Sequence, residues 1–555
     1  MSKWRMSSRI PTPARSAALD QFRGYIVVGM CLANFLAPFA AIHSVLKHND
    51  TYFSYADTIM PGFLFVVGFA FRLTYLKRRS VRGRWPTALA YVRRSGKLLL
   101  LSLVVYFFVG DIPRWFNIRE MPAEFMPTAG ESGATTSSEK TADRELPPFE
   151  GHRNLSSSAS PLPSSAASSA VERLRAWNAL SWPERLCVHW RVLSAKLVKS
   201  ELWETLAIIG ATQLVVLPWI GSPFWLRLFA MAVLGAAHGL LSYWIAWDFL
   251  YGINGNWLSQ AWMTGRDQGW DGGIFGPINW AVVMLGGTLA YDLVAASTSP
   301  RWALARLAVW GLAFMAIGYF MSCLTRLYDL DRGELAEMRA RCQREAEEKS
   351  ALRAALDERR LALKRLRESQ GKPSPDAAAR DEEQLQATIV ALEDRIRDAP
   401  DLSLAPSPVR PPWERLRGRS LGQMLAEPPF VAPPADEPQS DRPPAVEHRL
   451  RNYWMLGKRM PNLSFVTFAT GFQFALLALF SAACDVGGLR IGMFRTFGTN
   501  PLAAYFIHGA MALVLAVVVP HNASLAVCLV GFAITFAITY LLVRHLEKGG
   551  IYWRL

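Results

Sequence analysis

Five polar side chains lie in and around two apolar stretches near the start of the chain: Asp20, Arg23, Asn34, His48 and Asp57. Polar groups are costly inside a bilayer, so their gathering where two hydrophobic segments meet predicts chemistry or transport. A histidine can act there as a general acid or base near neutral pH. For His48 the alternative is simple placement at the membrane interface.

Helix capping would account for Asp57 and for a further polar residue, Asn500, without any function. Asp57 opens an apolar run, and Asn500 precedes Pro501 at the start of another. Short polar side chains at such positions accept hydrogen bonds from the first N–H groups of a helix. His508 lies about two turns beyond Pro501, where capping is excluded. It needs a partner, and Tyr505 lies on nearly the same face of the helix.

The residues around these side chains come in long apolar blocks, which indicates a polytopic membrane protein. The chain has 555 residues, of which 51% are hydrophobic, and a formal charge of +15. A spanning helix needs about 20 mostly apolar residues, and about ten stretches meet this requirement. We predict an all-α integral membrane protein with spans at 24–46, 58–76, 97–115, 202–220, 224–246, 275–297, 302–323, 462–484, 496–519 and 523–543.

The basic segments of the chain predict its orientation, because Lys and Arg of short loops gather on the cytoplasmic side. The N-terminus, the loop from Lys77 to Lys97 and the tail with Arg544 and Lys548 are basic, and the span count puts all three on one side. We therefore expect a multi-pass protein of a bacterial inner (cell) membrane with cytoplasmic termini and a retained first span. His48 and both long inserts then lie outside.

Two polar inserts divide the membrane core. We predict core segments at 1–117, 201–328 and 453–555. The insert at 118–200 is rich in Ser and Pro, which is typical of disorder, and it ends in a stretch that suits either a membrane-surface helix or a packed soluble helix. Leucines at four- and three-residue steps predict a coiled-coil hairpin at 329–399, with a proline-rich linker at 400–452. We expect both inserts to be dispensable for a folded core, and the hairpin to be a device for homo-oligomers.

The sequence argues against two other kinds of site. The six cysteines show no spacing typical of a metal site or a disulfide framework, so no metal is expected. The charges of the hairpin are balanced between acidic and basic residues, which need no nucleic-acid partner.

The loop at 251–273 carries Trp257, Trp262 and Trp270 near Asp271. Such rings either stack on a sugar-like or amine ligand or belong to an interfacial tryptophan belt.

Several stretches together resemble a known family of membrane enzymes. They are RSAALDQFRG, LKHNDTYFSYADTIMPGFLFVVG, GGIFGPINWAVVMLGG, NLSFVTFATG and FGTNPLAAYFIHG. In this order they are similar to the transmembrane acyltransferases typified by heparan-α-glucosaminide N-acetyltransferase. The resemblance covers all predicted spans and neither insert. It implies a helical core that takes acetyl-CoA, or another acyl-CoA, as a co-substrate from the cytoplasm, holds no permanent cofactor, and acylates an amino sugar or glycan on the other side.

The resemblance also implies roles for particular residues. It makes His48, in the pair Lys47-His48, the essential histidine, and it matches three further catalytic positions: Asp57, Asn500 and His508. Asn500 or His508 would donate to the thioester oxygen. Four basic residues would neutralise the CoA phosphates: Arg23, Lys77, Arg78 and Arg79.

The chain departs from the family pattern in two places. It has Thr51-Tyr52-Phe53 where the family usually carries Trp-Asn-Gly, and Glu204-Thr205 where the family tends to carry Gln-Arg. The first departure concerns the acceptor, and the second concerns a CoA contact.

An acyltransferase is the predicted function, and two other classes are weighed against it. A transporter or flippase would be expected to show internal repeats, and we find no convincing repeat. A membrane scaffold built on the coiled-coil insert would have an inactive core. The joint presence of His48, Asp57, Asn500 and His508 argues against the scaffold.

Overall fold

A computed structural model describes residues 17–109, 177–199, 203–253, 271–368, 403–431 and 448–553, with five positions between 384 and 392. Within these ranges the regular structure is helical, so the predicted all-α class is confirmed. Seven helical segments of the described chain are long and apolar enough to cross a membrane. The multi-pass membrane class is thereby confirmed, while the larger number of spans stays a prediction.

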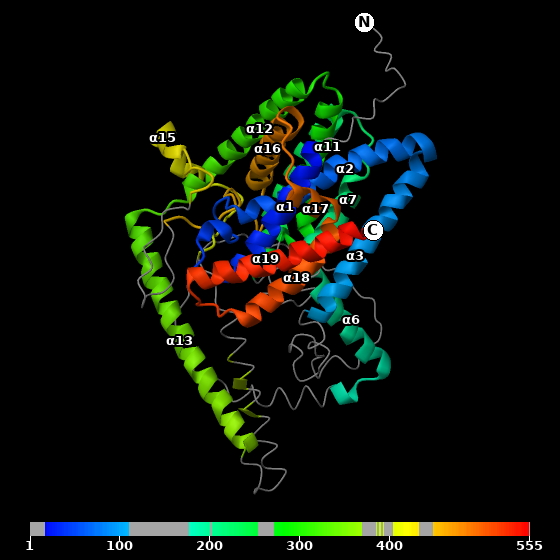
Figure 1. Ribbon diagram of the computed structural model, residues 1–555. Helices are drawn as coiled ribbons and strands as arrows, with labels where there is room; N and C mark the ends of the chain where they lie inside the picture. Colours follow the sequence, from blue (N-terminus) through cyan, green and yellow to red (C-terminus); the bar gives the residue numbers. More distant parts are fainter. Residues whose placement is uncertain are drawn as a thin grey trace.

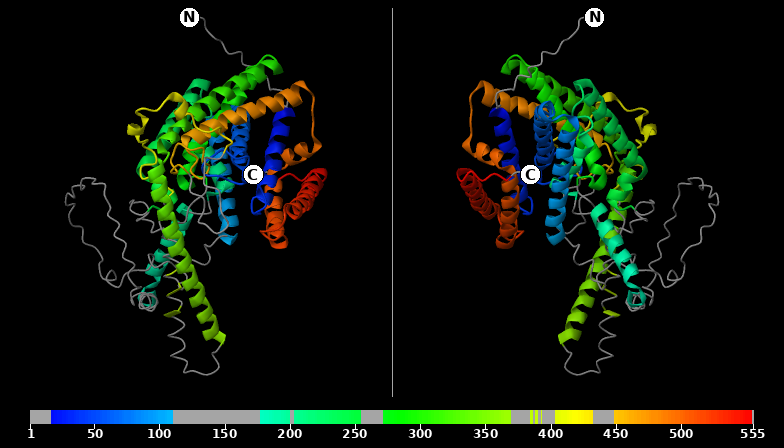
Figure 2. Two further views of the ribbon diagram at one scale, coloured as in Figure 1. Left: turned by 90° about the vertical axis from the view of Figure 1, so that its left-hand side faces the viewer. Right: turned by 90° about the vertical axis from the view of Figure 1, so that its right-hand side faces the viewer.

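The helices form one bundle with two projections (Figure 1). The bundle consists of α1 (Ala17–Leu36), α2 (Ile59–Arg82), α3 (Arg84–Val109), α7 (Thr205–Val216), α8 (Phe224–Leu241), α9 (Trp247–Tyr251), α11 (Gly276–Ala295), α12 (Pro300–Ser322), α16 (Leu463–Phe480), α17 (Gly492–Thr499), α18 (Pro501–Val518) and α19 (Leu525–Lys548). Outside it lie α6 (Trp182–Lys199), α13 (Arg332–Glu368) and the short α15 (Leu421–Met424). Figure 2 shows α6 and α13 projecting from the same end of the bundle.

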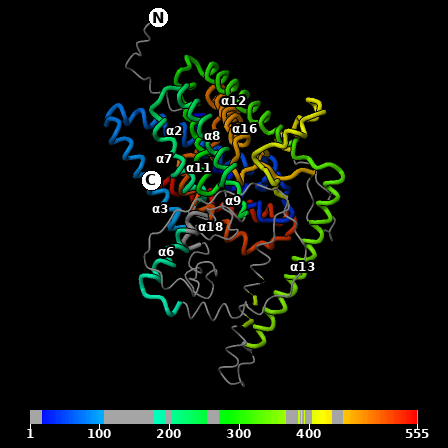
Figure 3. Tube along the Cα trace, turned by 180° about the vertical axis from the view of Figure 1, so that it is seen from behind, coloured from blue at the N-terminus to red at the C-terminus, as the bar shows by residue number. Residues whose placement is uncertain are grey.

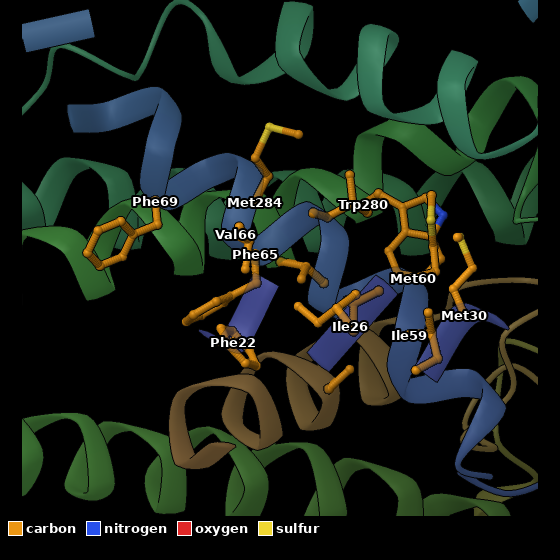
Figure 4. Packing of buried hydrophobic residues seen from close by; sticks show 14 of the residues in the cluster. Phe22, Ile26, Met30, Ile59, Met60, Phe65, Val66, Phe69, Trp280 and Met284 are labelled. Carbon is orange, nitrogen blue, oxygen red and sulfur yellow. The ribbon is translucent and has the colours of Figure 1, made fainter. Parts of the chain in front are cut away.

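Helix α11 lies at the centre of the bundle because it is apolar on nearly every side. It packs against α2, α7, α8 and α16, and α12 lies along α16 (Figure 3). Gly68 and Gly287 let the backbones of α2 and α11 touch, since a Cβ at Gly68 would clash with the carbonyl oxygen of Met284, and one at Gly287 with that of Phe65. Small residues commonly permit such close packing between membrane helices. Figure 4 shows the aromatic and aliphatic side chains that fill this core.

The first helix is shifted toward the N-terminus relative to the predicted span. Helix α1 covers Ala17–Leu36, whereas the expected span ran from 24 to 46. Pro38 lies two residues after the last helical residue, Leu36, and a proline disfavours helical backbone at the residue before it, here Ala37, and removes an N–H donor. The apolar residues beyond it form turns, with Phe39 and Ile42 buried in the core. Asp20 and Arg23 therefore lie within the helix.

The long polar helix α13 contains the first arm of the predicted coiled-coil hairpin. Leu356 of α13 is buried against Ile389 and Leu392, two of the described residues of the second arm. This contact agrees with a hairpin, and the coiled-coil seam and a role in oligomers stay predictions. The expected disordered stretch before residue 177 lies outside the described residues.

Part of the expected proline-rich linker packs onto the core. The ring of Phe430 lies 5.5 Å from that of Phe53, and the N–H of Phe53 donates to the carbonyl of Pro429 at 2.9 Å. Arg449 makes two hydrogen bonds to the carboxylate of Glu427, at 2.8 and 3.0 Å. Residues 403–431 are therefore a packed part of the fold. The expectation that this insert is dispensable does not extend to them.

Candidate functional site

A cavity of about 510 Å³ lies between the end of α1, the start of α2 and the middle of α18. Much of its wall is apolar, with Met30 from α1 and Met60 and Phe63 from α2. Eight polar side chains also line it: Asn34, His48, Glu204, Thr205, Asp271, Lys458, Tyr505 and His508. A cavity of this size with a few convergent polar groups is typical of a small-molecule site.

His48 and Asp57 form a hydrogen-bonded pair at one side of the cavity. Nδ1 of His48 lies 2.8 Å from Oδ1 of Asp57. The His48 side chain is 33% exposed, and the Asp57 side chain is 0% exposed. The other carboxylate oxygen, Oδ2, accepts from the N–H of Asn49 at 3.2 Å and from Oγ of Ser54 at 2.7 Å. The Asp57 carboxylate accepts these hydrogen bonds, and its bond to Nδ1 fixes which ring nitrogen of His48 carries the proton.

The expected helix-capping role of Asp57 is wrong. Asp57 lies in a short 3-10 helix, Ala56–Thr58, and the N-cap of α2 is Thr58. The chain turns at Asn49, whose side-chain Nδ2 donates to the carbonyl oxygen of Ser44 at 3.1 Å. The backbone N–H of the same residue donates to the Asp57 carboxylate, which therefore faces this corner. Thr58 therefore occupies the N-cap position of α2, and the Asp57 carboxylate bonds to His48 instead.

His43, the nearest rival of His48, has a local structural role. It caps the short helix Ser44–Leu46 by accepting the N–H of Val45 on its Nδ1 at 3.2 Å. It does not line the cavity. The structure thus separates the two histidines, which the sequence placed only five residues apart.

His508 of α18 also lines the cavity, and it is bonded at both ring nitrogens. Its Nδ1 is 2.5 Å from the carbonyl oxygen of Tyr505, and its Nε2 is 2.9 Å from Nδ2 of Asn34 on α1. A carbonyl oxygen only accepts, so Nδ1 carries a proton, and Nε2 accepts from the Asn34 amide. His508 therefore has a partner on α1, Asn34, in addition to the carbonyl of Tyr505 on its own helix. The Tyr505 side chain also lines the cavity, whereas Asn500 does not.

Asn500 occupies the N-cap position of α18, but its side chain does not cap the helix. Its amide nitrogen donates to the carbonyl of Ile551 at 2.9 Å, and its amide oxygen accepts the N–H of Trp553 at 3.1 Å. The side chain thus fastens the C-terminal segment to the start of α18. The hydrogen bonds of Asn500 explain its position without a reacting group.

The most informative polar pair was missed by the sequence reasoning. Nζ of Lys458, in the segment before α16, lies 3.3 Å from Oδ1 of Asp271. Burial by itself lowers the pKa of Lys458, but the carboxylates of Asp271, Asp57 and Glu204 outweigh this effect and raise the pKa above its ordinary value. The only signal in the sequence was a lysine directly before an apolar span, and this is also the usual position of a membrane-flanking lysine.

The four residues expected to bind CoA phosphates lie away from the cavity lining. Lys77, Arg78 and Arg79 are exposed in the last turns of α2, and Arg78 stacks over the ring of Tyr91 at 5.4 Å. Arg23 lies in the first half of α1. From Ile59 at the cavity to Lys77, α2 rises by about 27 Å, at about 1.5 Å per residue. The structure therefore puts the predicted base and the predicted phosphate site at opposite ends of α2.

A second charged cluster within the bundle was also not anticipated. Nε of Arg72 on α2 donates to Oδ1 of Asp292 on α11 at 3.1 Å. Arg227 on α8 pairs with the same carboxylate and donates from Nη1 to Oγ1 of Thr288 at 2.6 Å. These bonds tie three helices together. Because the guanidinium groups are bonded to protein atoms, the cluster has a structural role.

The comparison with protein families points to the same corner of the molecule. Residues 15–110 match the family model described as heparan-alpha-glucosaminide N-acetyltransferase, catalytic. The matched stretch contains α1, the corner with His48 and Asp57, α2 and α3. A search of curated proteins found no match. The resemblance expected from the sequence is confirmed over this stretch, which is similar to the catalytic part of a family of membrane acetyltransferases.

Proposed function

From the match of residues 15–110 to the heparan-α-glucosaminide N-acetyltransferase family model, we propose that the protein moves an acetyl or other acyl group from acyl-CoA to an amino sugar or glycan. The observation that supports this most is the pair of His48 and Asp57 in the wall of a ligand-sized cavity. Asp57 holds Nδ1 of His48 and thereby assigns Nε2 to the reaction.

The pair suits acyl transfer by either of two routes. In the direct route, Nε2 of His48 takes the proton of the acceptor amine as the amine attacks the thioester carbon. In the covalent route, Nε2 attacks first and carries the acyl group to the amine. In both routes His48 becomes positively charged, and the buried carboxylate of Asp57 stabilises that charge at 2.8 Å.

The acyl-CoA is proposed to lie along α2. Its phosphates would be neutralised by Arg23, Lys77, Arg78 and Arg79 at one end, with the thioester in the cavity at the other. The rise of about 27 Å between these ends requires an extended cofactor. Glu204 and Asp271 give the cavity carboxylates that suit a hydroxyl-rich or cationic acceptor.

The proposed topology has both termini in the cytoplasm and the His48 corner on the outer face of a bacterial inner membrane. The basic end of α2 then faces the cytoplasm, where acyl-CoA is made available. The acceptor enters the cavity from outside, and the lipid bilayer surrounds the helical core.

The direct test is to incubate purified protein with labelled acetyl-CoA and a panel of amino sugars. We expect label in an acid-stable acylated product with wild-type protein and none with His48→Asn. A transporter reconstituted in proteoliposomes would instead move the amino sugar across the membrane and form no acetylated product. Transport of the amino sugar without its acetylation in such proteoliposomes would reject the proposed function.

A further inference from the structure

A buried cation, Lys458, lines the same cavity as His48. Lys458 is 8% exposed, and its partner Asp271 is 3% exposed. A buried ion pair is weak evidence for stability, because the desolvation of both charges offsets their attraction. The two donors expected for the acyl oxygen from the sequence, Asn500 and His508, are bonded to Ile551 and Asn34. The cavity therefore contains a buried cation, Lys458, that has no role in the reaction so far. The reaction in turn lacks a donor to the acyl oxygen.

The backbone around Lys458 is fixed against the catalytic corner. The N–H of Gly272, next to Asp271, donates to the carbonyl of Arg459 at 2.8 Å. Gly457 lies so close to the carbonyl oxygen of Asp50 that a Cβ there would clash. A charge held this firmly needs little reorganisation when a reaction develops charge beside it.

Asp271 is held in place by an unusual backbone conformation. Its φ of 54° falls in the left-handed region, which residues other than glycine rarely adopt. The carbonyl oxygen of Asp271 accepts the indole N–H of Trp280 at 2.9 Å, which fixes the turn from the core side. Backbone strain of this kind clusters at functional sites, where the surrounding structure maintains it.

We propose that Lys458 is a catalytic residue of the acyl transfer proposed above, on which this inference rests. Its ammonium group stabilises the negative charge that develops on the acyl carbonyl oxygen. Asp271 is the positioning residue that holds the ammonium group in the cavity.

The movement of electrons during acyl transfer defines where the ammonium group of Lys458 acts. The lone pair of the attacking nitrogen forms a bond to the thioester carbon, and the π electrons of the C=O bond move onto the oxygen. Nε2 of His48 takes the proton of an attacking amine. When the oxyanion collapses, the C–S bond breaks, the sulfur leaves with its electron pair, and it receives that proton from His48. The oxyanion exists only between the attack on the thioester carbon and the loss of the sulfur. A cation that stabilises it therefore lowers the reaction barrier more than it strengthens substrate binding.

The charge on Lys458 persists across the working range of an enzyme. Burial lowers its pKa, but the carboxylates of Asp271, Asp57 and Glu204 outweigh burial, and the pKa lies above the ordinary value of 10.5. Asp57 contributes to this shift, so the ammonium group lies within electrostatic range of the pair with His48. Lys458 is therefore a donor, whereas proton transfer is left to the histidine.

The test measures kcat and KM for wild type, Lys458→Met, Lys458→Arg and the double variant Lys458→Met/Asp271→Asn, with acetyl-CoA and an amino sugar that wild type acetylates. We expect Lys458→Met to lower kcat by about 10²–10³-fold, the usual effect of removing one oxyanion donor, with both KM values little changed. Lys458→Arg keeps the charge and should restore part of kcat. Lys97→Met, on the exposed surface of α3, is the charge-matched control and should behave as wild type.

The double variant separates catalysis from structure. It leaves no unpaired carboxylate, and asparagine tolerates the left-handed backbone of position 271. If Lys458 stabilises the oxyanion, the double variant stays as slow as Lys458→Met although its thermal unfolding is restored. Recovery of kcat in the double variant would overturn the proposal, and so would a raised acceptor KM with unchanged kcat. A wild type that acetylates no amine would refute the proposed function and this inference with it.

Discussion

Substitution of Asp57 by Asn tests the proposal that Asp57 activates His48 as a base. Oδ2 of Asp57 accepts from Asn49 N at 3.2 Å and from Ser54 Oγ at 2.7 Å, so the single oxygen of an Asn side chain stays with these donors. Its NH₂ group then points at Nδ1 of His48, which must accept. The proton of the neutral ring moves to Nε2, and the ring can no longer act as a base toward the cavity.

The expected loss follows from what such a base contributes. General base catalysis is worth about 10²–10⁴-fold, which corresponds to about 3–5 kcal/mol in the barrier. One charge-assisted hydrogen bond is worth only about 1.5–3 kcal/mol of stability, so the protein should stay folded.

The assay is single-turnover acetylation by purified protein, with thermal unfolding measured on the same samples. Asp50→Asn is the matched control, because Asp50 lies on the same corner and meets Arg451 and Arg459 only at 3.7 Å. Such loose pairs contribute little, so the control should lie within about threefold of wild type. A folded Asp57→Asn protein that turns over within fivefold of wild type would refute the reasoning that Asp57 sets the tautomer.

Three further predictions concern topology, the insert and pH. A membrane-impermeant thiol reagent should label Cys342 on α13 in intact cells, and labelling only after permeabilisation would place α13 in the cytoplasm. Replacing residues 340–400 with a flexible linker should leave a monodisperse core, whereas extending the deletion to 444 also removes Glu427 and Phe430 and should lower the unfolding temperature; equal stability of the two deletions would contradict the packing role of 403–431. Burial raises the pKa of Glu427, but the hydrogen bonds and charges of Arg449 and Arg326 outweigh it and hold the pKa below 4.5. The stability that Glu427 contributes, about 1–3 kcal/mol, is therefore fully present above about pH 4.5 and lost as the pH falls further. Thermal unfolding of wild type and Glu427→Gln should converge in acid, and a constant difference down to pH 3 would count against the ion pair.

The sequence was sufficient where the partners of a residue lie close along the chain. His48 and Asp57 belong to one corner between two apolar runs, so their meeting follows from the hairpin alone. Asn34 and His508 meet across α1 and α18, and Lys458 and Asp271 meet across two loops. Hydropathy fixes which segments are helices, but it does not fix which faces of distant helices and loops meet. A lysine before an apolar span has the same local pattern whether it anchors the span or faces a cavity.

Composition was misleading in the second insert for a related reason. Residues 403–431 are rich in proline and poor in long apolar runs, which is also the composition of a linker. Their order comes from isolated anchors, such as Phe430 against Phe53 and Glu427 against Arg449. Each anchor needs a partner far away in the sequence, so local composition carries no sign of it. The end of α1 was misplaced for the opposite reason, since the apolar run continues past Pro38 although the helix does not.

The central claim is that acyl transfer takes place at His48, and the most direct measurement compares His48→Asn with His43→Asn. Both proteins should bind acetyl-CoA as wild type does, because the proposed phosphate site lies at the other end of α2. His43→Asn should retain most of the turnover, since His43 caps a short helix outside the cavity. His48→Asn should show no transfer of label from acetyl-CoA to an amino sugar. Turnover near that of wild type by the His48→Asn protein would contradict the account.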